Sequence, residues 1–242
     1  MPELVLVHGL GQEARAWDMV GIRGAYAHTL PGHGGRPPQR MSLPDMADEL
    51  AADAPPGLLD VVGVALGGIV AQHLIVRHPG RVRSALLAST TARVGDRPAL
   101  LARADEAQRR GLGPLTSSLV DRWFSPAEIA AEVAGIGYVQ AQLSAMPTAG
   151  YADMVRAMAE HDLVADLPRV TAPVTVLTGA DDRVGPDSAG ELARLLSHHR
   201  LRSAPGSHML HLGNPAGFRA EIGSHLDWVG SGALVPPPAR TG

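Results

Sequence analysis

Three positions in this sequence have the order expected of acyl-transfer chemistry, but one of them lacks a reactive atom. The turn Gly63-Val64-Ala65-Leu66-Gly67 follows an apolar run, Asp182 follows a later run, and His208 follows the next. In serine hydrolases a turn of this G-x-S-x-G type holds the nucleophile, a histidine takes its proton and a carboxylate orients the histidine. Here the central residue is Ala65, which has no hydroxyl.

One interpretation of the turn is a tight connection from strand to helix that has no chemical role, since pairs of glycines at this spacing are common. The backbone favours a replaced serine instead. Holding a residue with a Cβ in such a turn costs roughly 1–3 kcal/mol, and glycine would avoid most of that cost. Alanine keeps the strain without the chemistry. We therefore interpret Ala65 as an inactivating replacement of a serine, and a natural protein that has abandoned hydrolysis is the alternative.

Asp182 and His208 are expected to meet because loops at the carboxyl ends of parallel strands form the site in open α/β sheets. Each has a competitor close by, Asp181 for the acid and His211 for the base. Asp182 could also serve only in a loop turn, and His208 could be one of the surface histidines among the 11 in the chain.

An oxyanion hole requires two backbone N–H groups aimed at the developing charge. In the nucleophile-elbow design one comes from the residue after the nucleophile, here Leu66. The other comes from the loop after an early strand, here Leu10 in His8-Gly9-Leu10-Gly11. The alternative for that loop is a simple glycine turn.

Short apolar runs recur along the chain and predict strands. They lie at 4–7, 25–30, 58–64, 82–89, 173–179 and 199–203. Segments with helical patterns separate most of them. This alternation predicts an α/β fold, with a mostly parallel sheet flanked by helices.

The strand pattern disappears from about residue 92 to 166. Pro98 to Arg110 reads as a helix, and Ser125-Pro126-Ala127-Glu128 is a capping box that opens another helix, expected to end at Gly135. We predict a helical lid over 92–166, inserted between two strands of a core formed by 1–91 and 167–229. The proline-rich segment 230–242 is expected to be disordered.

Composition excludes several classes of function. The net charge is -3 with no basic block, so nothing indicates a nucleic-acid partner. There is no cysteine to form a disulfide or thiolate ligand and no lysine for a Schiff base. We expect no cofactor and no metal. The first residues lack a signal-peptide pattern and no apolar stretch is long enough to span a membrane, so a cytoplasmic protein is expected. Monomer and homodimer both remain open.

These features together resemble the α/β-hydrolase superfamily over nearly the whole chain. Within the lid, Thr90-Thr91-Ala92-Arg93-Val94-Gly95 and Arg122-Trp123-Phe124-Ser125-Pro126 are similar to stretches of the 3-oxoadipate enol-lactonase branch, N-T-A-A-R-I-G and R-W-F-T-P. The chain departs from that pattern in starting directly at the strand before His8 and in carrying Ala65 where the family has serine.

The resemblance implies a hydrolase of carboxylic esters or lactones that works by Ser-His-Asp acyl transfer on a small-molecule substrate. Arg122, Trp123 and Phe124 would line its substrate pocket. Trp17 is a further candidate for the pocket wall, with core packing as its alternative. Two other functions stay open on the same fold: a natural non-hydrolytic enzyme (a cyclase, a lyase or a cofactorless enzyme), and a ligand-binding protein.

Overall fold

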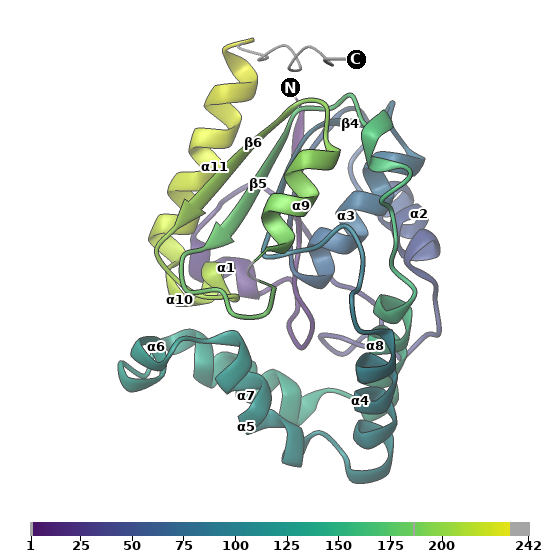
Figure 1. Cartoon of the computed structure of the whole chain (residues 1–242), viewed down its shortest axis with the longest axis vertical. Helices are drawn as coiled ribbons and strands as arrows, with labels where there is room; N and C mark the ends of the chain where they lie inside the picture. The colour runs from purple at the N-terminus through teal and green to yellow at the C-terminus, as the bar shows by residue number, and fades with distance from the viewer. Residues whose placement is uncertain (1, 186, 233–242) are drawn as a thin grey trace.

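The structure, a computed structural model, describes residues 2–185 and 187–232. Its centre is a six-stranded sheet with the order β2-β1-β3-β4-β5-β6, in which every neighbouring pair is parallel (Figure 1). The strands are β1 (Glu3–Val7), β2 (Tyr26–His28), β3 (Leu59–Val64), β4 (Val82–Ala88), β5 (Val174–Gly179) and β6 (His199–Ala204). The predicted α/β fold is confirmed.

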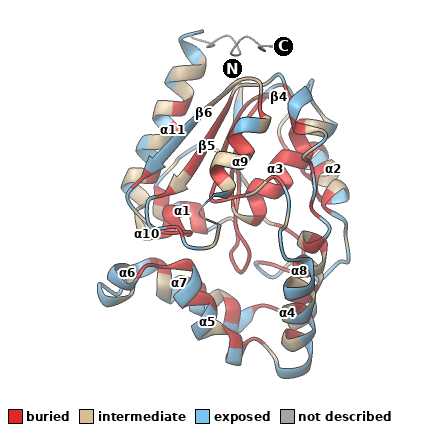
Figure 2. Ribbon diagram, viewed as in Figure 1, coloured by how far each residue is buried: buried red, intermediate tan, exposed pale blue. Residues whose placement is uncertain are grey.

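Successive residues of the inner strands pack into two different hydrophobic layers. In β1, Val5 and Val7 belong to the layer shared with α2 (Leu43–Asp53), α3 (Leu66–Arg77) and α9 (Ser188–Leu195). Leu6 belongs to the opposite layer, shared with α1 (Ala16–Val20) and α11 (Pro215–Gly230). Because both faces are covered, these strands read as continuous apolar runs rather than as alternating ones. Figure 2 shows the resulting buried centre.

A helical insertion separates β4 from β5 in the chain. It contains α4 (Arg97–Arg110), α5 (Gly113–Trp123), α6 (Pro126–Ala130), α7 (Ala134–Ala145) and α8 (Thr148–Ala159). Figure 1 places α5, α6 and α7 beyond the tips of the β5 and β6 arrows, which mark the carboxyl ends of those strands.

The two ends of the insertion pair with each other. Arg93 and Asp162 form an antiparallel bridge. Beside it, Val94 N–H donates to the His161 carbonyl at 3.0 Å, and Leu163 N–H donates to the Ala92 carbonyl at 3.0 Å.

The capping box at Ser125 is present, but the prediction that Gly135 ends its helix is wrong. Ser125 Oγ accepts from Glu128 N–H at 3.2 Å, and Ser125 N–H donates to Glu128 Oε2 at 2.7 Å. Helix α6 ends at Ala130, close to Glu132, which has φ +48°. Gly135 lies in the first turn of α7, where a Cβ would come within 2.6 Å of Leu212 Cβ. This glycine permits close packing and does not stop a helix.

Two short helices complete the fold, η1 (Leu167–Arg169) and α10 (Leu210–Gly213). Helix α11 continues to Gly230, the first residue of the predicted tail. Residues 233–242 of that tail lie outside the described residues. Across 2–185 and 187–232, none of the helices combines the length and apolar character needed to cross a bilayer.

Candidate active site

Ala65 joins β3 to α3 in a conformation that L-residues rarely adopt, with φ +50° and ψ −113°. The flanking glycines allow the backbones to approach. A Cβ on Gly67 would lie 2.6 Å from the His8 carbonyl oxygen, and one on Gly63 would lie 2.6 Å from the Gly67 carbonyl carbon. The predicted strand, sharp turn and helix are therefore all present, and the glycines are required by close contact.

Asp182 and His208 form a hydrogen-bonded pair. His208 Nδ1 lies 3.0 Å from Asp182 Oδ2 and 3.2 Å from Oδ1, and both residues are buried. Asp182 Oδ1 also accepts from Val184 N–H at 2.9 Å. Burial alone would raise the pKa of Asp182, but the hydrogen bond and charge of His208 outweigh it and lower that pKa. An ionised Asp182 favours the proton on Nδ1 and leaves Nε2 as the acceptor.

The competitors of this pair have other partners. His211 Nε2 lies 2.8 Å from Gln12 Oε1, and burial lowers the pKa of His211 to about 3. Asp181 donates its backbone N–H to the Gly206 carbonyl at 2.9 Å and lies next to the pair without joining it. The acid and the histidine that the sequence favoured are the two that meet.

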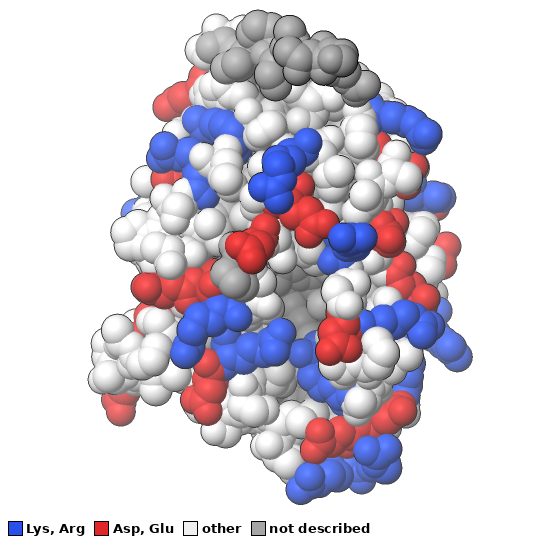
Figure 3. Space-filling view, in the orientation of Figure 1, with Lys and Arg blue, Asp and Glu red and all other residues white. Residues whose placement is uncertain are grey.

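A cavity of about 540 Å³ lies between the sheet and the insertion. Figure 3 shows a hollow between these two parts of the surface, with arginine side chains near its rim. Most of the predicted site residues line the cavity: Leu10, Ala65, Leu66, Arg122, Trp123, Asp182 and His208. Phe124 is not among the lining residues. It is fully buried in the core, and its carbonyl accepts from Arg183 at 3.1 Å.

The loop after β1 is held by side chains on both sides of Leu10. Gly9 N–H donates to Gln12 Oε1 at 3.4 Å, and Gly11 N–H donates to His33 Nε2 at 3.2 Å. Burial lowers the pKa of His33 to about 4, which keeps this ring a neutral acceptor. Leu66 is the first residue of α3, and the N–H groups of a first helical turn have no acceptor within the helix.

Sequence reasoning missed the contacts that fix the acid and histidine loops. Arg183 donates to the carbonyls of Asp121 and Phe124, at 3.0 and 3.1 Å. Ser207 Oγ donates to the Trp123 carbonyl at 2.8 Å. Both loops are thus fastened to the end of α5. In the sequence, these contacts are indicated only by the position of Arg183 directly after Asp182 and of Ser207 directly before His208.

Ser89 also lines the cavity and was not singled out from the sequence. Ser89 follows β4, has φ +48° and is 6% exposed. Among the described residues its hydroxyl makes no hydrogen bond of good geometry, but it lies near Asp182 and helps to lower the pKa of that carboxyl. Thr90, next to it, donates its hydroxyl to the Ala65 carbonyl at 3.1 Å.

Arg103 and Arg122 line the cavity on the side of the insertion. None of the ion pairs formed between described residues includes either arginine. Arg103 Nε is buried without a hydrogen-bond partner in the same part of the chain. Burial and the nearby charge of Arg122 lower the pKa of Arg103. An anionic group in the cavity would offset both effects.

Residues 4–221 match the sequence model of the alpha/beta hydrolase family. The chain belongs to this family. It is similar to 3-oxoadipate enol-lactonase 2 of Acinetobacter baylyi, at 31% identity over 161 residues, which span 66% of this chain and 60% of that protein. It is also similar to pimeloyl-[acyl-carrier protein] methyl ester esterase of Chromobacterium violaceum, at 30% identity over 93% of this chain and 94% of that protein.

Other relatives of this alpha/beta hydrolase agree with that assignment. (E)-2-((N-methylformamido)methylene)succinate hydrolase of Acinetobacter baylyi is 31% identical over 81% of this chain and 77% of that protein. Among solved structures, the enol-lactonase from Burkholderia xenovorans has the same fold, with a TM-score of 0.87 and 22% identity over 93% of this chain and 91% of that chain.

Proposed function

We propose that this chain carries the site of a carboxylic ester or lactone hydrolase, in which Ala65 occupies the position of the nucleophile. The observation that carries the proposal is that the Asp182–His208 pair and the strained turn at Ala65 open into one cavity. In the parent form, a serine at position 65 would attack the acyl carbon. His208 would take its proton and return it to the leaving alcohol. Asp182 would hold the imidazole in the correct tautomer.

Leu10 and Leu66 would donate their N–H groups to the oxyanion. Their neighbours support this assignment, because the N–H groups of Gly9 and Gly11 are already bound to Gln12 and His33. That arrangement fixes the loop on both sides of Leu10, which lines the cavity, and would leave its N–H free for the oxyanion. Preorganised donors of this kind contribute about 3–4 kcal/mol each to the stability of the transition state.

The insertion would act as a lid. Trp123 and Arg122 would form its part of the substrate pocket, with Arg103 beside them. Two arginines without carboxylate partners favour a substrate that carries an acidic group as well as the ester or lactone. The names of two relatives, built on 3-oxoadipate and on a substituted succinate, agree with such a substrate.

The alanine at position 65 is best explained as a replacement of serine that leaves binding intact and removes acyl transfer. Its φ of +50° is costly for any residue with a Cβ, so a turn without chemistry would favour glycine. In this form the hydrolase should be severely impaired, because loss of a triad nucleophile costs about 10⁶ in kcat in subtilisin.

The decisive experiment compares the Ala65 protein with Ala65→Ser. We expect Ala65→Ser to raise hydrolysis of aryl esters and small lactones by several orders of magnitude, and Ala65→Ser combined with His208→Ala to abolish the gain. Ala65→Gly is the matched control, since it relieves the backbone strain without adding a hydroxyl and should gain no activity.

Labelling with a fluorophosphonate removes the dependence on substrate choice. The Ala65→Ser protein should form one covalent adduct at position 65, which peptide mass spectrometry would locate. An adduct at Ser89 in the Ala65 protein would place the nucleophile just after β4 and contradict the proposal. Turnover of a native substrate by the Ala65 form, without any gain in Ala65→Ser, would favour a non-hydrolytic enzyme on this fold.

A further inference from the structure

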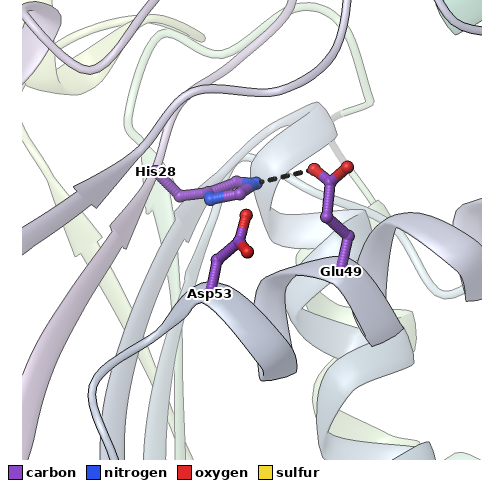
Figure 4. Close-up of side chains that lie close together, drawn as sticks. All are labelled: His28, Glu49 and Asp53. Carbon is purple, nitrogen blue, oxygen red and sulfur yellow. Dashed lines mark ion pairs between the residues drawn. The ribbon is translucent and has the colours of Figure 1, made fainter.

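Three side chains capable of binding a metal gather at the end of β2, away from the cavity described above. His28 is the last residue of β2, and Glu49 and Asp53 lie on α2. Figure 4 shows the imidazole and the two carboxylates directed toward one another. One ligand atom from each residue can be chosen so that all three lie within 4.8 Å of one another.

The local structure explains why these groups meet. Glu49 and Asp53 are four residues apart, so they project from one face of α2 on successive turns. His28 reaches this face from the neighbouring strand, and its Nε2 lies 3.4 Å from Glu49 Oε1. Two ligands bound at about 2.1 Å to a tetrahedral ion are about 3.4 Å apart, so this spacing already suits a shared cation.

The histidine provides an independent indication of a ligand. His28 is 2% exposed, and within the described residues its Nε2 makes no hydrogen bond of good geometry, while Glu49 Oε1 faces it at 3.4 Å. Its other nitrogen, Nδ1, lies 3.4 Å from the Tyr26 hydroxyl. In metal sites the second ring nitrogen commonly binds an outer partner that orients the ring, and Tyr26 has that place here.

The two carboxylates of the cluster differ in their partners. Arg36 contacts Glu49 at 3.0 Å and also donates to the Thr29 carbonyl. Asp53 forms no ion pair with any residue of 2–185 or 187–232. A carboxylate has about four lone-pair sites, so Glu49 can accept from Arg36 and still bind an ion.

We propose that His28, Glu49 and Asp53 bind a first-row divalent cation, with zinc as the best match to one imidazole and two carboxylates. The ion would fasten the end of β2 to α2 and complete its coordination with water. The segment after β2 carries His33, which holds Gly11 in the loop beside the cavity. The site lies apart from the cavity, and the proposal does not depend on the proposed hydrolase function.

The test is titration of chelator-treated protein with ZnSO₄ by calorimetry, together with the melting temperature. The protein should bind one equivalent of zinc tightly, with a rise in melting temperature that grows with the zinc concentration. Asp53→Asn, at an exposed position, should keep the fold and weaken binding at least tenfold, and His28→Ala should abolish it.

His78→Ala is the matched control. His78 also pairs with a carboxylate of α2, Asp48, at 2.7 Å, but among the described residues no third metal-binding side chain joins this pair. This variant should bind zinc like the unchanged protein. If the unchanged protein binds no zinc, or if Asp53→Asn and His78→Ala weaken binding equally, the proposal is wrong. With equal weakening, the zinc would be held by scattered surface histidines.

Discussion

The contacts inside the sheet part differ in kind from the contacts inside the helical insertion. Within the sheet part, backbones approach so closely that a Cβ on Gly67 would lie 2.6 Å from a carbonyl oxygen. Within the insertion, α4 and α8 contribute buried residues such as Ala104 and Met154 to the core, and exposed ion pairs join their outer faces, such as Arg156 with Asp105 at 2.6 Å. Figure 2 shows the exposed outer faces of these helices beside the buried sheet. Close backbone contact thus positions the turn at Ala65, whereas the outer faces of α4 and α8 are joined by exposed side chains.

The largest expected effect is on the sheet part and comes from acidification. Burial lowers the pKa of His33 and His225 to about 4 and that of His211 to about 3. Between about pH 6.5 and pH 4 the unfolded chain binds protons at these rings and the folded chain does not. The free energy of unfolding is therefore independent of these rings above about pH 6.5. Below that pH it falls by about 1.4 kcal/mol per pH unit for each such histidine, until the pH reaches the pKa of the folded state.

Urea unfolding at a series of pH values measures this slope directly. His225→Asn should lower the slope by about one proton, whatever it does to stability at pH 7. An unchanged slope in His225→Asn would mean that this ring does not titrate as its burial implies. If the free energy of unfolding of the unchanged protein did not depend on pH, the buried histidines of the sheet part would not have the expected effect.

The next effect in size concerns close backbone contact. Gly67→Ala should lower the free energy of unfolding by about 3 kcal/mol or more, because the added Cβ meets the carbonyls of Val7 and His8, which cannot move independently. Gly137→Ala in α7 is the control, since nothing lies within 4 Å of its added Cβ. It should stabilise the protein by up to about 1 kcal/mol. Chemical denaturation measures both, and equal effects would contradict the comparison.

The smallest expected effect is the difference in stability between substitutions in the two capping boxes. Ser42 caps α2 in the sheet part and Ser125 caps α6 in the insertion, each with an acidic partner three residues later. Ser42→Ala should cost about 1 kcal/mol of global stability. Ser125→Ala should cost less than half of that, because α6 can open without the sheet. Hydrogen exchange should instead become faster at α6, and a global loss equal to that of Ser42→Ala would show that the insertion unfolds together with the sheet.

The strands were predictable because each is a short apolar run covered on both faces, as Leu59–Val64 illustrates with six buried residues. Helices α5 and α7 were not predicted. Helix α7 contains Gly135 and Gly137, which lower helix propensity, and it has few charged residues to mark an exposed face. Its formation depends on packing against distant residues such as Leu212, which no local pattern reveals.

The candidate site was predictable to the extent that strand order determines it. Asp182 and His208 lie at the ends of adjacent strands β5 and β6, so their hydrogen bond follows from the topology. The position of Phe124 did not follow, because Trp123 is the last helical residue of α5 and lines the cavity, whereas Phe124 has an extended backbone and is buried in the core. The roles of these residues in catalysis remain predictions.

The bridge between Arg93 and Asp162 has a consequence for how this fold can diversify. Residues paired in an antiparallel bridge lie about 5 Å apart, so the insertion leaves the sheet and returns to it at nearly the same point. A short turn could join these two positions without moving β4 or β5. A different set of helices grafted at this junction should therefore change the substrate range, provided that the acceptors for Arg183 and Ser207 at the end of α5 are kept.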